Sequence, residues 1–149
     1  MYLHFHSKEA LAWSVAADGY DRLIEAMREA DHADAGTAAD RLRAQAHAFW
    51  LFAQSNRGVF RLMFGHDIGH LDPNTSEHPG SRLWRQWLAA VRACEAEGHA
   101  WPVSTERTAE ELWSAVLGRF ALWSTTFGQT ESHSPREFTD YLPDRLLAQ

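Results

Sequence analysis

The chain has 149 residues, of which 45% are hydrophobic, and its acidic side chains outnumber the basic ones to give a net charge of −6. That length is enough for one domain with a substantial core, and the apolar fraction excludes an intrinsically disordered chain. The acidic balance argues against unaided binding to nucleic acid or to an anionic membrane surface.

The longest stretch without Asp, Glu, Lys or Arg covers residues 44–56, and it is shorter than the roughly 18 apolar residues of a membrane-spanning helix. No positively charged segment followed by an apolar run opens the sequence, so we expect no signal peptide. The single cysteine, Cys94, excludes an internal disulfide and fits a reducing compartment. We therefore expect a soluble, cytoplasmic protein with no membrane partner.

Apolar residues recur at spacings of three and four along most of the chain, which predicts helices. The first helix is expected over about residues 7–30, because Ser7 is a good N-cap and Glu9 suits the positive first turn. A second helix is expected over residues 38–55, and a short third helix within residues 56–65.

The rest of the chain continues this pattern after a loop, which Gly and Pro predict at residues 66–80. Further helices are predicted over about residues 81–97, over about residues 108–127, and from Ser134 onward. Thr108 and Glu111 would form a capping box, and Pro143 should kink or split the last helix. No strand pattern or internal repeat occurs, so the predicted fold is all-α, a bundle of about six helices.

The first residues, "MYLHFHSKEAL", contain aromatic side chains that lead directly into a helix start. They resemble a boundary in TetR-family transcriptional regulators, where the recognition helix of the helix-turn-helix ends and the next helix begins. The family pattern, Y-x-[YH]-F-x-[SN]-K-x-x-L, is filled in register by Tyr2, His4, Phe5, Ser7, Lys8 and Leu11.

Two later stretches extend the resemblance more loosely. "FAQSNRGVFRLMFG" is similar to the family segment A-x-x-[NH]-P-x-x-[FY]-x-x-[ML]-F, and "ELWSAVLGRFALW" is similar to the long dimer helix of one subgroup. That subgroup carries Trp, three residues, and then His-Gly. Trp113 and Gly118 match it, but Leu117 replaces the His, so a subgroup effector cannot be carried over.

The resemblance implies that Tyr2, His4 and Lys8 touch the DNA backbone. The residue chemistry agrees, because a helix N-terminus with a hydroxyl and an ammonium group suits a phosphate oxygen. The alternative is that Ser7 only caps a helix and that Lys8 is solvated. Residues 1–30 hold three basic and five acidic side chains, so they form no basic patch.

The family places two helices before the recognition helix, and this sequence has neither of them. We therefore expect residues 1–6 to be a remnant of the recognition helix. Residues 7–149 form the ligand-binding and dimerisation domain in this interpretation. Residues 1–149 would bind DNA only if the missing helices preceded them. A misplaced start, a shortened chain and a truncated gene are equally compatible with this pattern.

The expected function is the effector-binding and dimerisation core of a repressor, without enzymatic activity and without a cofactor. The resemblance implies a homodimer formed by the last two long helices, through Trp123, Phe127, Phe138, Tyr141, Leu142 and Leu146. It also implies a pocket between the long helices for a small hydrophobic or aromatic effector, lined by Phe49, Trp50, Phe60, Met63, Phe64, Trp84, Trp87, Trp113, Leu117 and Phe120. Packing within a single chain is the alternative for both sets.

Other classes of function have less support in the sequence. His66 and His70 have a spacing that suits a metal on one helical face, but Gly65 and Gly69 disfavour a helix there. Cys94 could be paired with His99 as a nucleophile and its base, yet Cys94 lies on an apolar face, where a buried inert thiol is expected. A headless partner that pairs with intact regulators and inactivates them is the remaining alternative.

Overall fold

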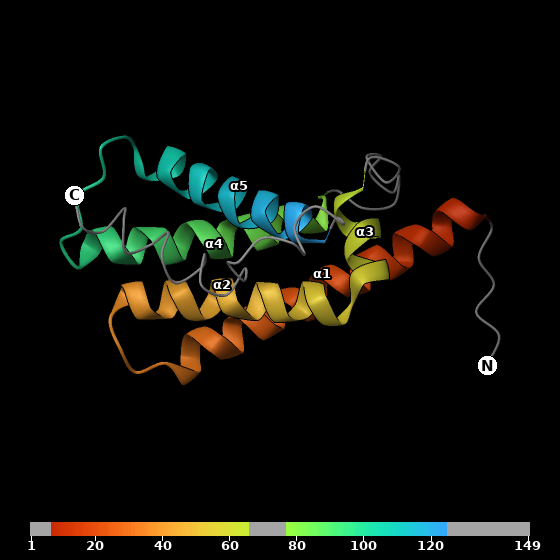
Figure 1. Cartoon of the computed structure of the whole chain (residues 1–149), viewed down its shortest axis with the longest axis horizontal. Helices are drawn as coiled ribbons and strands as arrows, with labels where there is room; N and C mark the ends of the chain where they lie inside the picture. The colour runs from red at the N-terminus through yellow and green to blue at the C-terminus, as the bar shows by residue number, and fades with distance from the viewer. Residues whose placement is uncertain (1–6, 66–76, 125–149) are drawn as a thin grey trace.

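Five α-helices occur in the computed structural model, which describes residues 7–65 and 77–124 (Figure 1). They are α1 (Lys8–Ala33), α2 (Ala38–Ser55), α3 (Arg57–Phe64), α4 (Pro79–Ala96) and α5 (Thr105–Trp123). The prediction of an all-α bundle is confirmed. The last predicted helix, with Ser134 and Pro143, lies outside the described residues, as does the expected remnant at residues 1–6.

The four long helices lie side by side and α3 crosses one end of them (Figure 1). α1 runs antiparallel to α2, and α4 runs antiparallel to α5 (Figure 1). α1 packs against α2, α3 and α4, so the first helix contacts most of the bundle. Its N-terminal part extends past the other helices, and Leu11 there is 45% exposed.

Side-chain caps explain where the first two helices begin. The Ser7 hydroxyl accepts a hydrogen bond from the Ala10 N–H at 3.0 Å, as predicted for an N-cap. α2 begins with a capping box, in which Thr37 and Asp40 each accept from the other's backbone N–H. The observed bounds of α2 agree with the prediction, and α1 continues three residues beyond the predicted Ala30.

α4 starts two residues before the predicted Ser81. Pro79 occupies the first helical position, where its missing N–H costs nothing. The imidazole of His78 acts as the N-cap, with Nδ1 accepting from the Gly80 N–H at 2.9 Å. At the other end of α4, Gly98 adopts a positive φ of 101°, which glycine tolerates and which ends the helix as predicted.

The predicted start of α5 at Thr108 is wrong, because the helix already begins at Thr105. Ser104 is the N-cap, and its hydroxyl accepts from the Arg107 N–H at 3.3 Å. Thr108 lies inside the helix with 2% exposure, and its hydroxyl has no hydrogen-bond partner among the described residues. The Thr105 hydroxyl donates to Glu95 at 2.7 Å, so a contact with the end of α4 helps to fix this helix start.

The centre of the bundle is mainly apolar. The largest fully buried side chains here include Leu23, Met27, Leu42, Val91 and Cys94. The few buried polar side chains include Gln45 on α2, which is 2% exposed, donates to Asp31 at 3.1 Å and accepts from Gln86 at 3.3 Å. These bonds satisfy a buried amide and connect α1, α2 and α4.

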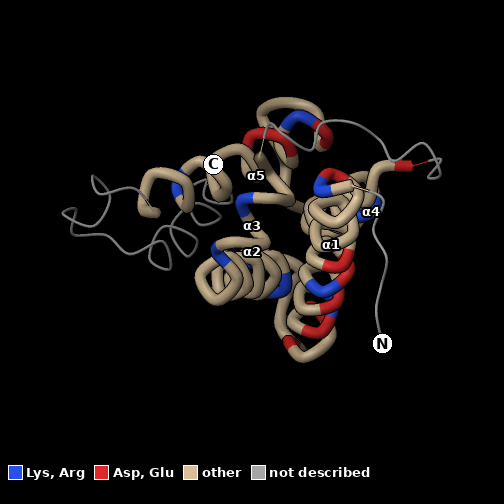
Figure 2. Tube along the Cα trace, turned by 90° about the vertical axis from the view of Figure 1, so that its right-hand side faces the viewer, with Lys and Arg blue, Asp and Glu red and all other residues tan. Residues whose placement is uncertain are grey.

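Acidic side chains recur along α1, and basic ones stand between them rather than in a patch (Figure 2). Several of the charges are paired, as in Arg28 with Glu25 at 2.8 Å. The sequence predicted no basic patch in residues 1–30, and the described part of that segment, residues 7–30, forms none. No helix within the described ranges has both the length and the apolar character needed to cross a membrane.

Candidate functional site

The aromatic residues predicted to line a pocket gather at the end of the bundle where α3 lies. Seven of them, together with Trp123, make ring contacts that join α2, α3, α4 and α5. We call this group the aromatic cluster. Its members are Phe49, Trp50, Phe60, Phe64, Trp87, Trp113, Phe120 and Trp123.

Phe49 is at the centre of the cluster and is completely buried. Its ring lies 5.0 Å from Trp113 and 5.7 Å from Phe60, measured between centroids, and both contacts have an edge-to-face geometry. Phe60 continues the chain of contacts to Phe120 at 4.8 Å. Such pairs stabilise a core by about 0.5–1.5 kcal/mol each beyond their apolar area. The cluster therefore forms a mostly buried apolar core contributed by four helices.

The cluster reaches α1 through Tyr20, a residue that was not among the predicted pocket positions. The Tyr20 ring lies 5.7 Å from Phe64, and its hydroxyl donates to the Met63 carbonyl oxygen at 2.7 Å. Burial raises the pKa of Tyr20 to about 12. His78 lies 5.5 Å from the Tyr20 ring. The available sequence signal was the position of Tyr20 on the apolar face of the first helix.

The opposite side of the cluster carries polar atoms next to rings. Trp50 and Trp123 lie 5.7 Å apart, and the guanidinium of Arg57 lies over the Trp123 ring at 5.4 Å. The indole N–H of Trp50 is buried and has no hydrogen-bond partner among the described residues. In contrast, the indole N–H of Trp87 donates to the Ala109 carbonyl at 2.9 Å. Arg57 was not predicted as a site residue.

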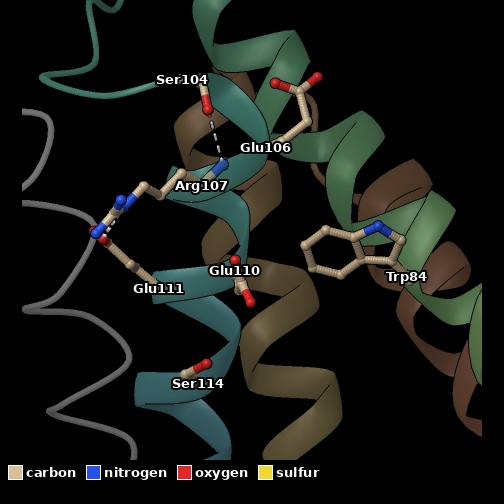
Figure 3. Close-up of a pocket in the computed structure, with 7 residues that line it drawn as sticks. All are labelled: Trp84, Ser104, Glu106, Arg107, Glu110, Glu111 and Ser114. Atoms are coloured by element: carbon tan, nitrogen blue, oxygen red, sulfur yellow. Dashed lines mark hydrogen bonds and ion pairs between the residues drawn. The ribbon is translucent and has the colours of Figure 1, made fainter.

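The three other predicted pocket residues differ in their surroundings. Met63 is 5% exposed and belongs to the core, and Leu117 is partly buried against it. Trp84 lies apart from the ring contacts and lines a surface groove of about 650 Å³ between α4 and α5. Figure 3 shows Trp84 and Glu110 facing each other across this groove, with Ser114 one helical turn away.

The groove of Trp84 is lined mainly by polar and charged side chains of α5. Arg107 donates to Glu111 at 3.0 Å (Figure 3). Glu106 accepts from Arg92 at 2.7 Å. The hydrogen bond with Arg92 holds the pKa of Glu106 below its ordinary value. These pairs are solvent-exposed, so each contributes little to stability. A second groove, of about 630 Å³, lies between the end of α1 and α2 and is lined largely by alanines.

Of the residues predicted for a dimer interface, only Trp123 lies within the described part of the chain. It is partly buried and contacts Trp50 and Phe120 of its own chain. The outward side of α5 nearby carries small residues: Ser114, Gly118 and Ala121 are all exposed. A Cβ atom added at Gly118 would meet nothing within 4 Å. Phe127, Phe138, Tyr141, Leu142 and Leu146 lie outside the described residues.

The predicted DNA-contacting residues are located only in part. Lys8 is exposed and follows the Ser7 cap at the first turn of α1, at the end that extends past the bundle. Tyr2 and His4 lie outside the described residues.

The alternative chemistry at Cys94 is not supported. Cys94 is completely buried, and burial raises the pKa of its thiol to about 11, which disfavours the reactive thiolate. His99 contacts it through the backbone, where the His99 N–H donates to the Cys94 carbonyl at 3.2 Å. Across residues 7–65 and 77–124, no group of three His, Cys, Asp or Glu side chains is arranged to hold a metal. His66 and His70 lie outside the described residues.

Comparison with solved structures supports the same fold. A protein of unknown function from Rhodococcus sp. RHA1 superposes with a TM-score of 0.82 and 24% sequence identity. The match covers 98% of this chain and 76% of that one. No curated protein matches the chain.

A family comparison gives the more specific result. Residues 42–146 match the model of the family described as "Tetracyclin repressor-like, C-terminal domain". Domains of this kind generally dimerise and bind small-molecule effectors in transcription regulators, and in general they are non-enzymatic. The matched segment holds all ten predicted pocket residues and most of the chain, so the protein belongs to the family of tetracyclin repressor-like C-terminal domains.

Proposed function

We propose that this chain is the effector-binding and dimerisation core of a repressor of the TetR type, and that it forms homodimers. The observation that carries the proposal is the aromatic cluster, because four helices contribute rings to one continuous apolar cluster within the matched region. Ligand sites in proteins are mostly apolar and lie between such elements. The cluster also touches α1, the helix that would connect this core to a DNA-binding head.

The effector that fits the cluster is a small hydrophobic or aromatic molecule. Phe49, Phe60 and Trp113 would offer it ring edges and faces, and Leu117 adds an apolar side chain at the signature His position. Tyr20 would connect this region to α1, since its ring contacts Phe64 and its hydroxyl bonds to Met63 of α3. The residues that line the site remain a proposal.

The proposed dimer interface includes the outward face of α5. Ser114, Gly118 and Ala121 are exposed and small, which lets the backbone of a partner helix approach closely. Leu122 on the same helix is 59% exposed, and covering it would contribute to association by about 25 cal/mol per Å² of apolar surface. The residues after Ser124 that were predicted for this interface belong to the same proposal.

DNA binding belongs in this proposal only to a protein that also carries the helix-turn-helix. There, Tyr2, His4 and Lys8 would contact phosphates and position the recognition helix without reading the sequence. The exposure of Lys8 beside the capped start of α1 supports this role.

Native mass spectrometry of the purified chain tests the proposal. We expect a dimer, and an additional small-molecule mass when the effector is retained from the expression host. Gly118→Glu should shift the population toward monomer, because it introduces a charge on the proposed interface. Gly58→Glu is the matched control, since a Cβ at Gly58 also meets nothing within 4 Å but Gly58 lies on α3. A monomeric wild-type chain that carries no ligand would overturn the proposal.

A further inference from the structure

The indole N–H of Trp50 is a buried donor that the fold leaves without a partner among the described residues. Burying such a group unpaired costs free energy, so folded proteins pair most of them. The same protein satisfies the equivalent group of Trp87 with the Ala109 carbonyl. Trp101, outside the aromatic cluster, shares this state, so the unpaired N–H of Trp50 is a contrast with Trp87 within the cluster.

Two further observations concern the surroundings of this donor. Trp50 as a whole is only partly buried, so the ring borders on solvent although its nitrogen does not. Its neighbour Trp123 also carries the guanidinium of Arg57 on its ring, at 5.4 Å. Among the salt bridges within residues 7–65 and 77–124, none involves Arg57. The Trp50 ring and the Arg57 guanidinium thus both contact the Trp123 ring, and a neutral N–H and a positive charge are each suited to an oxygen acceptor.

We infer that Trp50 is the polar anchor of the effector site, and that the effector is an aromatic molecule carrying an oxygen acceptor which receives the Trp50 N–H. This inference rests on the proposed function, because it assigns the chemical class of the effector to the same site. The aromatic part of the effector packs against rings of the cluster, and its oxygen occupies the place of the missing partner. Leu117 supplies no polar group, so the donor that fixes the orientation of the effector comes from α2 instead of α5.

The inference is tested with three probes that share one ring: toluene without an acceptor, acetophenone with a neutral acceptor, and benzoate with an anionic one. Dissociation constants are measured by isothermal titration calorimetry on the full chain. We expect at least one of the two acceptor-bearing probes to bind about tenfold more tightly than toluene. If the chain binds benzoate more tightly than acetophenone and Arg57→Gln removes this difference, the effector belongs to the anionic class of acceptor-bearing aromatic molecules.

Trp50→Phe retains an aromatic ring but removes the donor. It should weaken the acceptor-bearing probes about tenfold, to the affinity of toluene, and leave toluene itself unchanged. Trp101→Phe is the matched control, because its indole N–H is also buried and unpaired among the described residues, but it lies beside His99 in the connection between α4 and α5. This variant should leave all three affinities as they are.

The outcomes separate the inference from the function on which it rests. Equal binding of the three probes by the wild-type chain would overturn the role of Trp50 while supporting an aromatic effector site. A preference for an acceptor that survives in Trp50→Phe would overturn the role of Trp50 as well. Binding of none of the probes would count against both proposals. The wild-type comparison decides between these outcomes even if Trp50→Phe does not fold.

Discussion

Replacing Gly19 with alanine should destabilise the fold, although alanine is the better helix former. A Cβ atom at Gly19 would lie 2.5 Å from Val59 Cγ1 and 2.7 Å from Met63 Sδ. Contacts this short require both side chains to move, or the backbones to separate. Val59 is stiff at χ1 in a helix, and Met63 is 5% exposed within the core. Gly19 is therefore the position that lets α1 approach α3 closely.

The size of the effect follows from two opposed contributions. Removing a helical glycine stabilises a protein by about 0.4–1 kcal/mol through the unfolded chain. Overpacking a well-packed interface costs about 1–3 kcal/mol. When both contributions act, the free energy of unfolding should fall by about 1 kcal/mol at the middle of these ranges, and by at most about 2.6 kcal/mol.

Urea denaturation followed by far-UV circular dichroism measures this difference, at one protein concentration because self-association would also add stability. Gly58→Ala is the matched control, and it should gain about 0.4–1 kcal/mol because its Cβ meets open space. Combining Gly19→Ala with Val59→Ala should give a favourable coupling energy, since the shorter side chain relieves the contact. A Gly19→Ala protein as stable as the wild type, with no coupling to Val59, would refute the close-approach argument.

Three further predictions concern single side chains. Burial raises the pKa of Tyr20 to about 12 from its ordinary 10.0, so the folded state favours the neutral phenol. The free energy of unfolding should therefore fall as the pH rises from about 10 to 12. Urea titrations at pH 9 and pH 11 measure this fall, and Tyr20→Phe should remove the contribution. Ser104→Ala should lower the stability by about 1 kcal/mol, because it removes the cap of α5. Thr108→Val should be neutral or stabilising, because that buried hydroxyl has no partner among the described residues. The melting temperatures of the two variants should therefore shift in different directions or by clearly different amounts. Cys94 should react with iodoacetamide at pH 8 only when urea unfolds the protein, and mass spectrometry that finds rapid labelling of the folded chain would contradict its burial.

The bounds of the helices could be predicted wherever local chemistry decides them. Ser7 caps α1, residues 38–55 form α2, and Gly98 ends α4, as the sequence indicated. Each of these ends depends on a side chain or a backbone conformation within a few residues. Local patterns therefore carried enough information for the fold class and for most helices.

The start of α5 was mispredicted because two local signals compete there. Thr108 with Glu111 fits a capping box, but Ser104 is the actual cap. The hydrogen bond from Thr105 to Glu95 attaches the first turn of α5 to the end of α4. That contact joins two helices across their connection, so no pattern within one helix could reveal it.

Most residues of the aromatic cluster could be predicted from the sequence. Which of their polar atoms find a hydrogen-bond partner could not. Trp50 and Trp87 both occupy apolar faces of long helices and are equivalent by sequence pattern. In the fold, a carbonyl on α5 accepts the N–H of Trp87, while the N–H of Trp50 has no partner among the described residues. Ring area alone would let many apolar molecules bind such a cluster, since contacts of this kind are weakly directional. Because one buried donor can discriminate molecules that differ by a single oxygen, the specificity of the site should depend on Trp50 more than on the larger number of rings around it.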